Sequence, residues 1–113
     1  MLRDETIQRV LQFRDDRDWR QFHTPKDLAL SLSLEASELL EVFQWSGAEL
    51  DCPQGKEEAL REELADVLSC CILLADVCGL DLDEILNEKI TKNAQKYPVE
   101  KAKGRSDKYT EYL

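Results

Sequence analysis

The sequence has little of the chemistry that builds zinc sites or disulfide frameworks. Its one histidine, His23, argues against a zinc site and against the Glu-x-x-His pattern of di-iron carboxylate bundles. The four cysteines, at positions 52, 70, 71 and 78, have no CxxC spacing, and three of them lie within one helical segment. We therefore expect them to be small buried apolar side chains in a reducing cytoplasm.

Positive charge and long apolar runs are also scarce. The 15 Lys and Arg residues against 24 Asp and Glu residues give a net charge of −9, which argues against a nucleic-acid duplex or an anionic membrane as a partner. The longest apolar run, residues 67–80, is interrupted by Ser69 and Asp76 and is too short to cross a bilayer. The charged first six residues lack the apolar run of a secretory signal, so we expect a cytoplasmic protein.

Strand-like alternation is absent as well, and helical periodicity takes its place. We predict an all-α fold, a four-helix bundle assembled as an oligomer, because 113 residues bury only part of their surface in one core. Residues 1–113 are expected to form a single domain, with residues 99–113 as a polar C-terminal tail. The four helices are predicted at about residues 4–17, 25 to between 44 and 47, 56–78, and 82 to just before Pro98.

Capping residues mark several of these helix ends. Thr24 followed by Pro25 and Asp27 is typical of a helix start, with Thr24 as the N-cap. Gly79 suits the position just after the third helix, and Asp81 begins a capping box for the fourth.

Two predicted helices carry informative faces. The first helix places a charged residue, Arg14, on the same side as three apolar ones, Ile7, Val10 and Leu11. The third helix is apolar nearly all round over residues 70–78, more than one neighbouring helix could cover. We infer a subunit interface at that part of the third helix.

An acidic pair, Glu35 and Glu38, lies on the second predicted helix. Each residue advances the helix by roughly 100°, so Glu35 falls in the middle of the apolar stripe and Glu38 at its edge. A second pair, Glu63 and Asp66, has the same spacing on the flank of the third helix's stripe. Either pair alone could be half of an ordinary solvated helix face.

Facing each other across a helix interface, the two pairs would need a compensating charge. Ionised groups in such a place cost on the order of several kcal/mol each unless they are compensated. Four oxygen ligands suit a hard divalent cation, so we predict Mg²⁺, with Mn²⁺ as a substitute.

Further polar and aromatic residues are candidates for binding a ligand. Lys89 and Asn93 lie on the inward face predicted for the fourth helix, with Lys96 close by, and could contact phosphate oxygens; Lys89 could equally pair with a glutamate. The remaining candidates are Trp19, Phe22, His23 and Trp45, because flat aromatics near metal-bound phosphates could stack on a base, although single aromatics are more often core or interface residues. Trp45 would project on the side of Glu38 if the second helix reaches that far.

Five motifs in collinear order give the chain a family resemblance. The motifs are RDWRQFH at residues 17–23, EASELLEVFQW at 35–45, EELADVL at 62–68, KITKN at 89–93 and KYPV at 96–99. With them the chain resembles the MazG-like all-α nucleoside triphosphate pyrophosphohydrolases, and within that group the small dCTP pyrophosphatase type, from about residue 7 to residue 110.

The resemblance implies magnesium-dependent hydrolysis of the α–β phosphoanhydride of a nucleotide to the monophosphate and pyrophosphate. We expect dCTP or a modified dCTP to be the preferred substrate, in the housecleaning of the nucleotide pool. It also implies a homotetramer, a dimer of dimers whose sites are completed across subunits. Cys70 departs from the dCTP-type relatives, which often have an aromatic there, so the base or sugar preference stays open.

By position, the resemblance also implies roles for individual residues. Glu35, Glu38, Glu63 and Asp66 correspond to metal ligands; Lys89 and Asn93 to residues that contact the triphosphate; Trp19, His23 and Trp45 to residues around the base and sugar. We also predict that Lys96 and Tyr97 bind the substrate. Glu38 is the first candidate for the general base and Glu41 the second.

Two alternatives remain at this point. The same fold could act on dUTP or on a broad set of nucleoside triphosphates. The chain could also be a non-catalytic helical oligomer that binds a protein partner through its acidic faces.

Overall fold

The computed structural model describes residues 2–112, and the described residues form helices and loops without any strand. The prediction of an all-α fold is confirmed. The chain divides into two compact units, Met1–Gly79 and Leu80–Leu113. The longer helices are α1 (Asp4–Asp16), α2 (Pro25–Glu41), α3 (Glu57–Val77) and α4 (Leu82–Lys96). Three short pieces complete the chain: η1 (Arg20–Phe22), α5 (Val99–Ala102) and η2 (Tyr109–Glu111).

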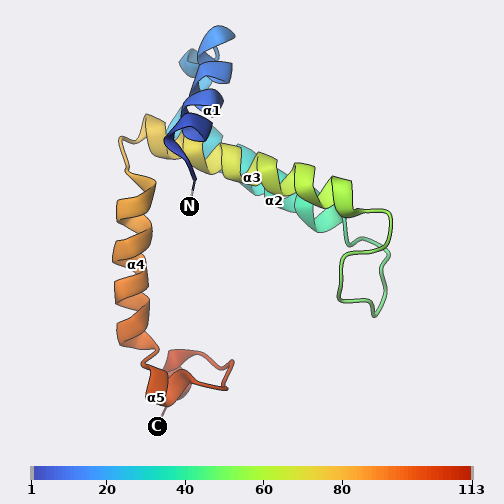
Figure 1. Ribbon diagram of the computed structural model, residues 1–113, viewed down its shortest axis with the longest axis vertical. Helices are drawn as coiled ribbons and strands as arrows, with labels where there is room; N and C mark the ends of the chain where they lie inside the picture. The colour runs from blue at the N-terminus through green and yellow to red at the C-terminus, as the bar shows by residue number, and fades with distance from the viewer. Residues whose placement is uncertain (1, 113) are drawn as a thin grey trace. The chain divides into compact units, whose positions relative to one another are not determined.

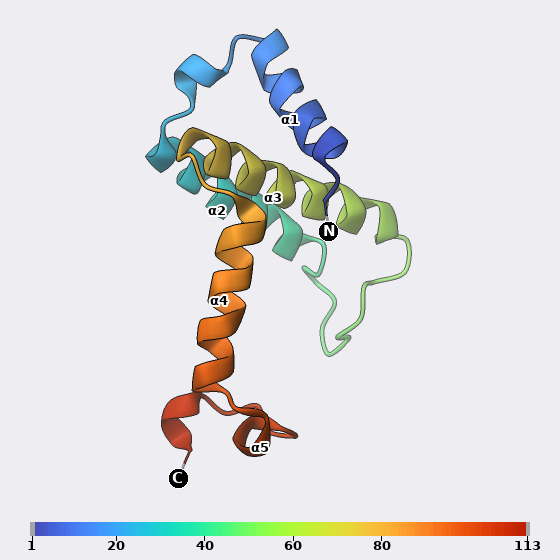
Figure 2. The ribbon, with the colours of Figure 1, turned by 60° about the vertical axis from the view of Figure 1, so that its left-hand side comes forward.

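The first unit is organised around α2 and α3, which run side by side in opposite directions (Figures 1 and 2). Apolar side chains between them form a small core: Leu28, Val42, Ile72 and Ala75 are each at most 6% exposed. The predicted start of α2 is confirmed, because the Asp27 backbone N–H donates to Thr24 Oγ1 at 3.1 Å with Pro25 in the first turn. The apolar side chains therefore determine which faces of α2 and α3 pack together.

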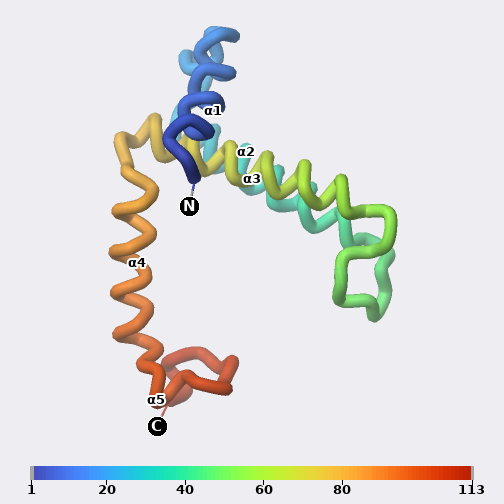
Figure 3. Tube along the Cα trace, viewed as in Figure 1, coloured from blue at the N-terminus to red at the C-terminus, as the bar shows by residue number. Residues whose placement is uncertain are grey.

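The end of α2 differs from the prediction. The helix stops at Glu41, before the predicted end between residues 44 and 47, because the next backbone N–H groups, those of Val42, Phe43 and Gln44, donate to carbonyls three residues back. Trp45 then takes a φ of +68°, a left-handed conformation that no helix continues. Figure 3 traces the long loop that leads from there to α3.

Helix α1 packs on α3 through an ion pair whose arginine is buried. Arg14 is only 4% exposed, and its Nη1 lies 2.7 Å from Asp76 Oδ2 near the end of α3. The neighbouring inward residues of α1 are half-buried as the sequence predicts: Ile7, Val10 and Leu11.

The second unit is built from α4 and the segment that follows it. Asp81 Oδ1 accepts the Glu84 N–H at 3.0 Å, which confirms the predicted cap, and α4 ends two residues before Pro98 as expected. The predicted polar tail carries α5 and η2, and its two tyrosines, Tyr109 and Tyr112, lie with edge-to-face geometry on Tyr97. None of the described helices is long and apolar enough to span a membrane.

Candidate functional site

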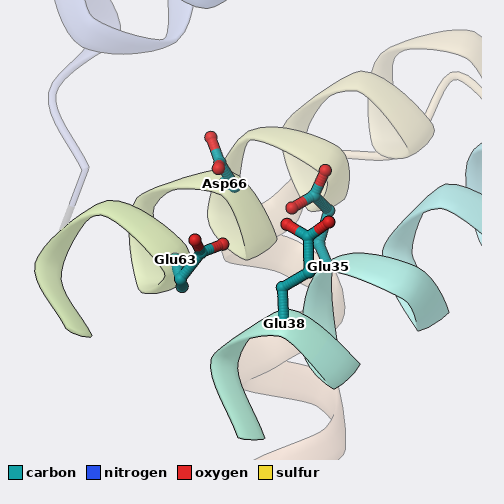
Figure 4. Close-up of side chains that lie close together, drawn as sticks. All are labelled: Glu35, Glu38, Glu63 and Asp66. Carbon is teal, nitrogen blue, oxygen red and sulfur yellow. The ribbon is translucent and has the colours of Figure 1, made fainter. Parts of the chain in front are cut away.

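Four carboxylates converge where α2 and α3 face each other (Figure 4). Glu35 and Glu38 project from α2 and Glu63 and Asp66 from α3, and one carboxylate oxygen of each lies within 4.8 Å of the others. Glu35 and Glu63 are half-buried, while Glu38 and Asp66 are exposed. The i, i+3 spacing produces this arrangement because it keeps both acidic residues of each helix on the surface that meets the other helix.

Burial and mutual repulsion set the electrostatics of this acidic cluster, the four residues just named. The pKa of Glu35 is raised, first by burial and then by hydrogen bonding and charge repulsion from Glu38, with smaller contributions from Asp66 and Glu63. The pKa of Glu63 is raised for the same reasons, burial first and Glu38 next. A carboxylate is therefore harder to ionise at these two positions than in water.

Two oxygens of the cluster also have no partner. Glu35 Oε2 and Glu63 Oε2 are buried and make no hydrogen bond, which costs free energy in a folded protein. A divalent cation would satisfy both atoms and offset the repulsion that raises the two pKa values. The donor set, four carboxylates without nitrogen or sulfur, fits a hard cation that prefers oxygen.

The thiol of Cys70 lies close to this cluster. It follows Asp66 by one helical turn on α3, and its pKa is raised, first by burial and then by the negative charge of Glu35. The position that departs from the dCTP-type pattern is thus half-buried beside the carboxylates.

The three predicted base-binding residues do not come together within one chain. Trp19 and His23 flank η1 just before α2 begins, whereas Trp45 follows α2 at its other end and is 92% exposed. The 17 residues of α2 rise by about 25 Å. Trp19 makes an edge-to-face contact with Phe13, with ring centroids 5.8 Å apart, and His23 Nδ1 is buried without a hydrogen-bond partner.

The remaining predicted substrate residues belong to the second unit. Lys89 and Asn93 lie one turn apart on α4 and both are exposed. Lys96 Nζ lies 5.2 Å from the centre of the Tyr109 ring, and Tyr97 is packed against Tyr109 and Tyr112. Glu41, the second candidate for the general base, is the last residue of α2 and is exposed outside the acidic cluster.

Sequence reasoning did not include Asp76 among the functional candidates. Its carboxylate contacts Arg14 of α1 and also Arg20 of η1. The available signal was a charged residue in each of two apolar stripes, since Arg14 lies on the inward side of the first helix and Asp76 interrupts the apolar run of the third. Opposite charges at such positions indicate a pair.

The all-helical fold and the acidic cluster agree with one family of proteins. The chain matches the MazG-like family over residues 30–112, and it belongs to that family.

Individual relatives give the comparison more detail. The chain is similar to dCTP pyrophosphatase 1 of Mus musculus, at 41% identity over 112 residues that cover 95% of this chain and 66% of the relative. The dCTP pyrophosphatase 1 of Homo sapiens is 42% identical with the same coverage. This chain thus spans about two thirds of the length of these curated relatives. A crystal structure of a pyrophosphatase from Archaeoglobus fulgidus DSM 4304 is similar with a TM-score of 0.77 and 41% identity, covering 84% of this chain and 91% of that one.

Proposed function

We propose that this protein is a magnesium-dependent nucleoside triphosphate pyrophosphohydrolase. It cleaves the α–β phosphoanhydride of a deoxynucleotide, with dCTP or a modified dCTP preferred, and releases the nucleoside monophosphate and pyrophosphate. The observation that carries the proposal is the acidic cluster, with two buried oxygens that lack partners and two exposed carboxylates beside them. The names of the similar dCTP pyrophosphatases support the class of substrate, and that of the similar crystal structure supports the class of reaction.

The carboxylates serve two purposes in this chemistry, as metal ligands and as the general base. Glu35, Glu38, Glu63 and Asp66 would hold Mg²⁺, or Mn²⁺ in its place, which when bound neutralises the triphosphate and makes the attacked phosphorus more electrophilic. Glu38 is exposed at the cluster, so its carboxylate can accept the proton of the attacking water; Glu41 is the second candidate because it lies one turn further on.

The acidic cluster contains no positive charge or hydrogen-bond donor for phosphate, and the cationic and polar residues of α4 supply these. Lys89 donates to phosphate oxygens and stabilises the charge that develops on the leaving pyrophosphate, and Asn93 adds an amide donor one turn away. Lys96 and Tyr97 extend this face toward the substrate. We propose that the two units form one domain, with α4 completing a four-helix bundle, and that the protein works in the cytoplasm, where its four free cysteines stay reduced.

The separation of the aromatic residues favours an oligomer. If Trp19, His23 and Trp45 contact one nucleotide, they come from more than one copy, because about 25 Å of helix separates them in a single chain. Apolar side chains exposed on α2 and α3 offer a surface for such assembly: Leu30 and Leu34 are 54% and 67% exposed, and Leu64 and Leu68 are 47% and 43%. A homotetramer, a dimer of dimers, satisfies both observations.

The test is release of pyrophosphate from a panel of nucleoside triphosphates, including dCTP, 5-modified dCTP and dUTP, with and without Mg²⁺. Turnover of dCTP that depends on Mg²⁺ supports the proposal. Equal turnover of every nucleotide would support the proposed reaction but reject the preference for dCTP. No turnover of any nucleotide by the folded protein would reject the enzyme class.

A further inference from the structure

A single carboxylate oxygen joins three elements of the first unit. Asp76 Oδ2, near the end of α3, accepts a hydrogen bond from Arg14 Nη1 of α1 at 2.7 Å. The same oxygen lies 4.0 Å from Arg20 Nε of η1. Arg14 thus ties α1 to α3 by a hydrogen bond, and Arg20, whose side chain is 58% exposed, adds a longer ion pair from η1 to the same oxygen.

The Arg14 side chain of α1 has a well-defined position. Arg14 is 4% exposed, and its Nε also donates to Asp15 Oδ1 at 2.9 Å, so the guanidinium has little freedom to turn. The Asp76 side chain is one third exposed. The buried Arg14 guanidinium therefore keeps its position, because moving it would break charged hydrogen bonds in a place that water reaches poorly.

The same arginine also shapes the backbone that leads to η1. The Arg14 carbonyl accepts the N–H groups of Arg17 at 3.2 Å and Trp19 at 3.1 Å, and Asp18 between them has a φ of +54°. The chain thereby reverses directly after α1. The residues that follow, 19–23, contain both Trp19 and His23.

We infer that Asp76 is a positioning residue for substrate binding: through Arg14 and Arg20 it fixes the 19–23 segment, and with it the side chains that face the nucleoside. This inference rests on the proposed function. Asp76 itself contacts no substrate and lies outside the acidic cluster. It acts on the affinity for the nucleotide and not on the hydrolytic step.

The test compares the kinetics of three proteins with those of the wild type. Asp76→Asn keeps the shape of the side chain and removes its charge. Asp15→Asn is the matched control, because Asp15 contacts the same arginine but lies on the same helix and joins no second element. The double variant Arg14→Met, Asp76→Leu replaces the ion pair by apolar packing, a change that often preserves stability.

For Asp76→Asn we expect a KM for dCTP raised by about tenfold, with kcat changed by less than about twofold. Binding of Mn²⁺ alone, measured by calorimetry, should be unchanged because the acidic cluster is intact. The double variant should unfold at a temperature near that of the wild type and still show the raised KM, whereas Asp15→Asn should show the wild-type KM.

Two results would overturn the inference. One is a wild-type KM in the double variant, which would mean that the pair only stabilises the fold; this variant decides the matter if Asp76→Asn does not fold. The other is an unchanged KM in a folded Asp76→Asn. If the wild type hydrolyses dCTP normally, either result rejects the positioning role of Asp76 and leaves the proposed function standing. If the wild type hydrolyses no nucleotide, the proposed function and this inference are both rejected.

Discussion

At the scale of single residues, Glu35 shows what a cation bound at the acidic cluster would offset. Its carboxylate is half-buried, one of its oxygens has no partner, and burial together with Glu38 raises its pKa. A group whose pKa is raised by folding binds its proton more tightly in the folded state. Its favourable contribution is full below the ordinary carboxyl pKa and is lost as the pH rises through the raised pKa. Without a metal ion, the contribution of Glu35 to the stability of the fold should therefore fall as the pH rises from the ordinary carboxyl pKa through the raised one.

Glu35→Gln removes this pH-dependent loss. In the presence of a chelator at neutral pH, the variant should unfold at a higher temperature than the wild type, because the buried repulsion is gone. Added Mg²⁺ should raise the unfolding temperature of the wild type more than that of the variant, since a ligand stabilises only the state that binds it. Thermal unfolding followed by circular dichroism at several pH values measures both effects.

Glu58→Gln is the control for this experiment. Glu58 is exposed in the first turn of α3 and lies outside the acidic cluster. The unfolding temperature of Glu58→Gln should respond to pH and to Mg²⁺ as that of the wild type does. A Glu35→Gln protein that is less stable than the wild type without metal would contradict the account of the cluster.

At the scale of elements, the N-cap of α2 holds the helix that carries Glu35 and Glu38. Thr24→Ala leaves the Asp27 N–H without its acceptor and should lower the free energy of unfolding by about 1 kcal/mol. Thr24→Ser keeps the hydroxyl and should restore most of that loss. Urea unfolding of the three proteins measures the difference; equal midpoints for Thr24→Ala and the wild type would mean that packing against α3 alone fixes the start of α2.

Most of the helical elements could be predicted from the sequence, because their ends carry local signals. Thr24 and Asp81 cap their helices as predicted, and Gly79 follows α3 with a φ of +66°. The end of α2 could not be predicted in the same way. The signal in the sequence is Gly47, but the chain leaves the helix at Glu41 and turns through the left-handed Trp45, a conformation that an aromatic residue adopts rarely.

The acidic cluster was the most predictable part of the site, since helical spacing places each pair on one face and burial follows from the apolar stripe. The contact between Arg14 and Asp76 was harder to predict. Arg14 and Asp76 lie 62 positions apart, and a long-range pair of this kind becomes visible only when α1 is packed on α3. The roles of Lys89, Asn93 and the aromatic residues remain predictions, because they depend on assembly.

At the scale of the whole molecule, we expect each site to take residues from two subunits. Trp19→Ala and Trp45→Ala should each bind dCTP poorly when made alone. Co-expressed, they should recover roughly a quarter of wild-type turnover, because half of randomly formed pairs are mixed and each mixed pair contains one intact site. Pyrophosphate release by the whole population of co-expressed oligomers, purified through one tag that both variants carry, measures the recovery. No recovery in mixed oligomers would place all the aromatic residues of a site in one chain.

The central claim is that the acidic cluster is the catalytic centre of a nucleotide pyrophosphohydrolase. The most direct test is pyrophosphate release from dCTP in the presence of Mg²⁺ by the wild type and by Glu38→Gln, which differ in one exposed carboxylate of the cluster. The account predicts clear turnover by the wild type and a loss of at least about 100-fold in kcat for the variant, with the fold retained. Equal rates for the two proteins would show that the carboxylates converge for a purpose other than catalysis.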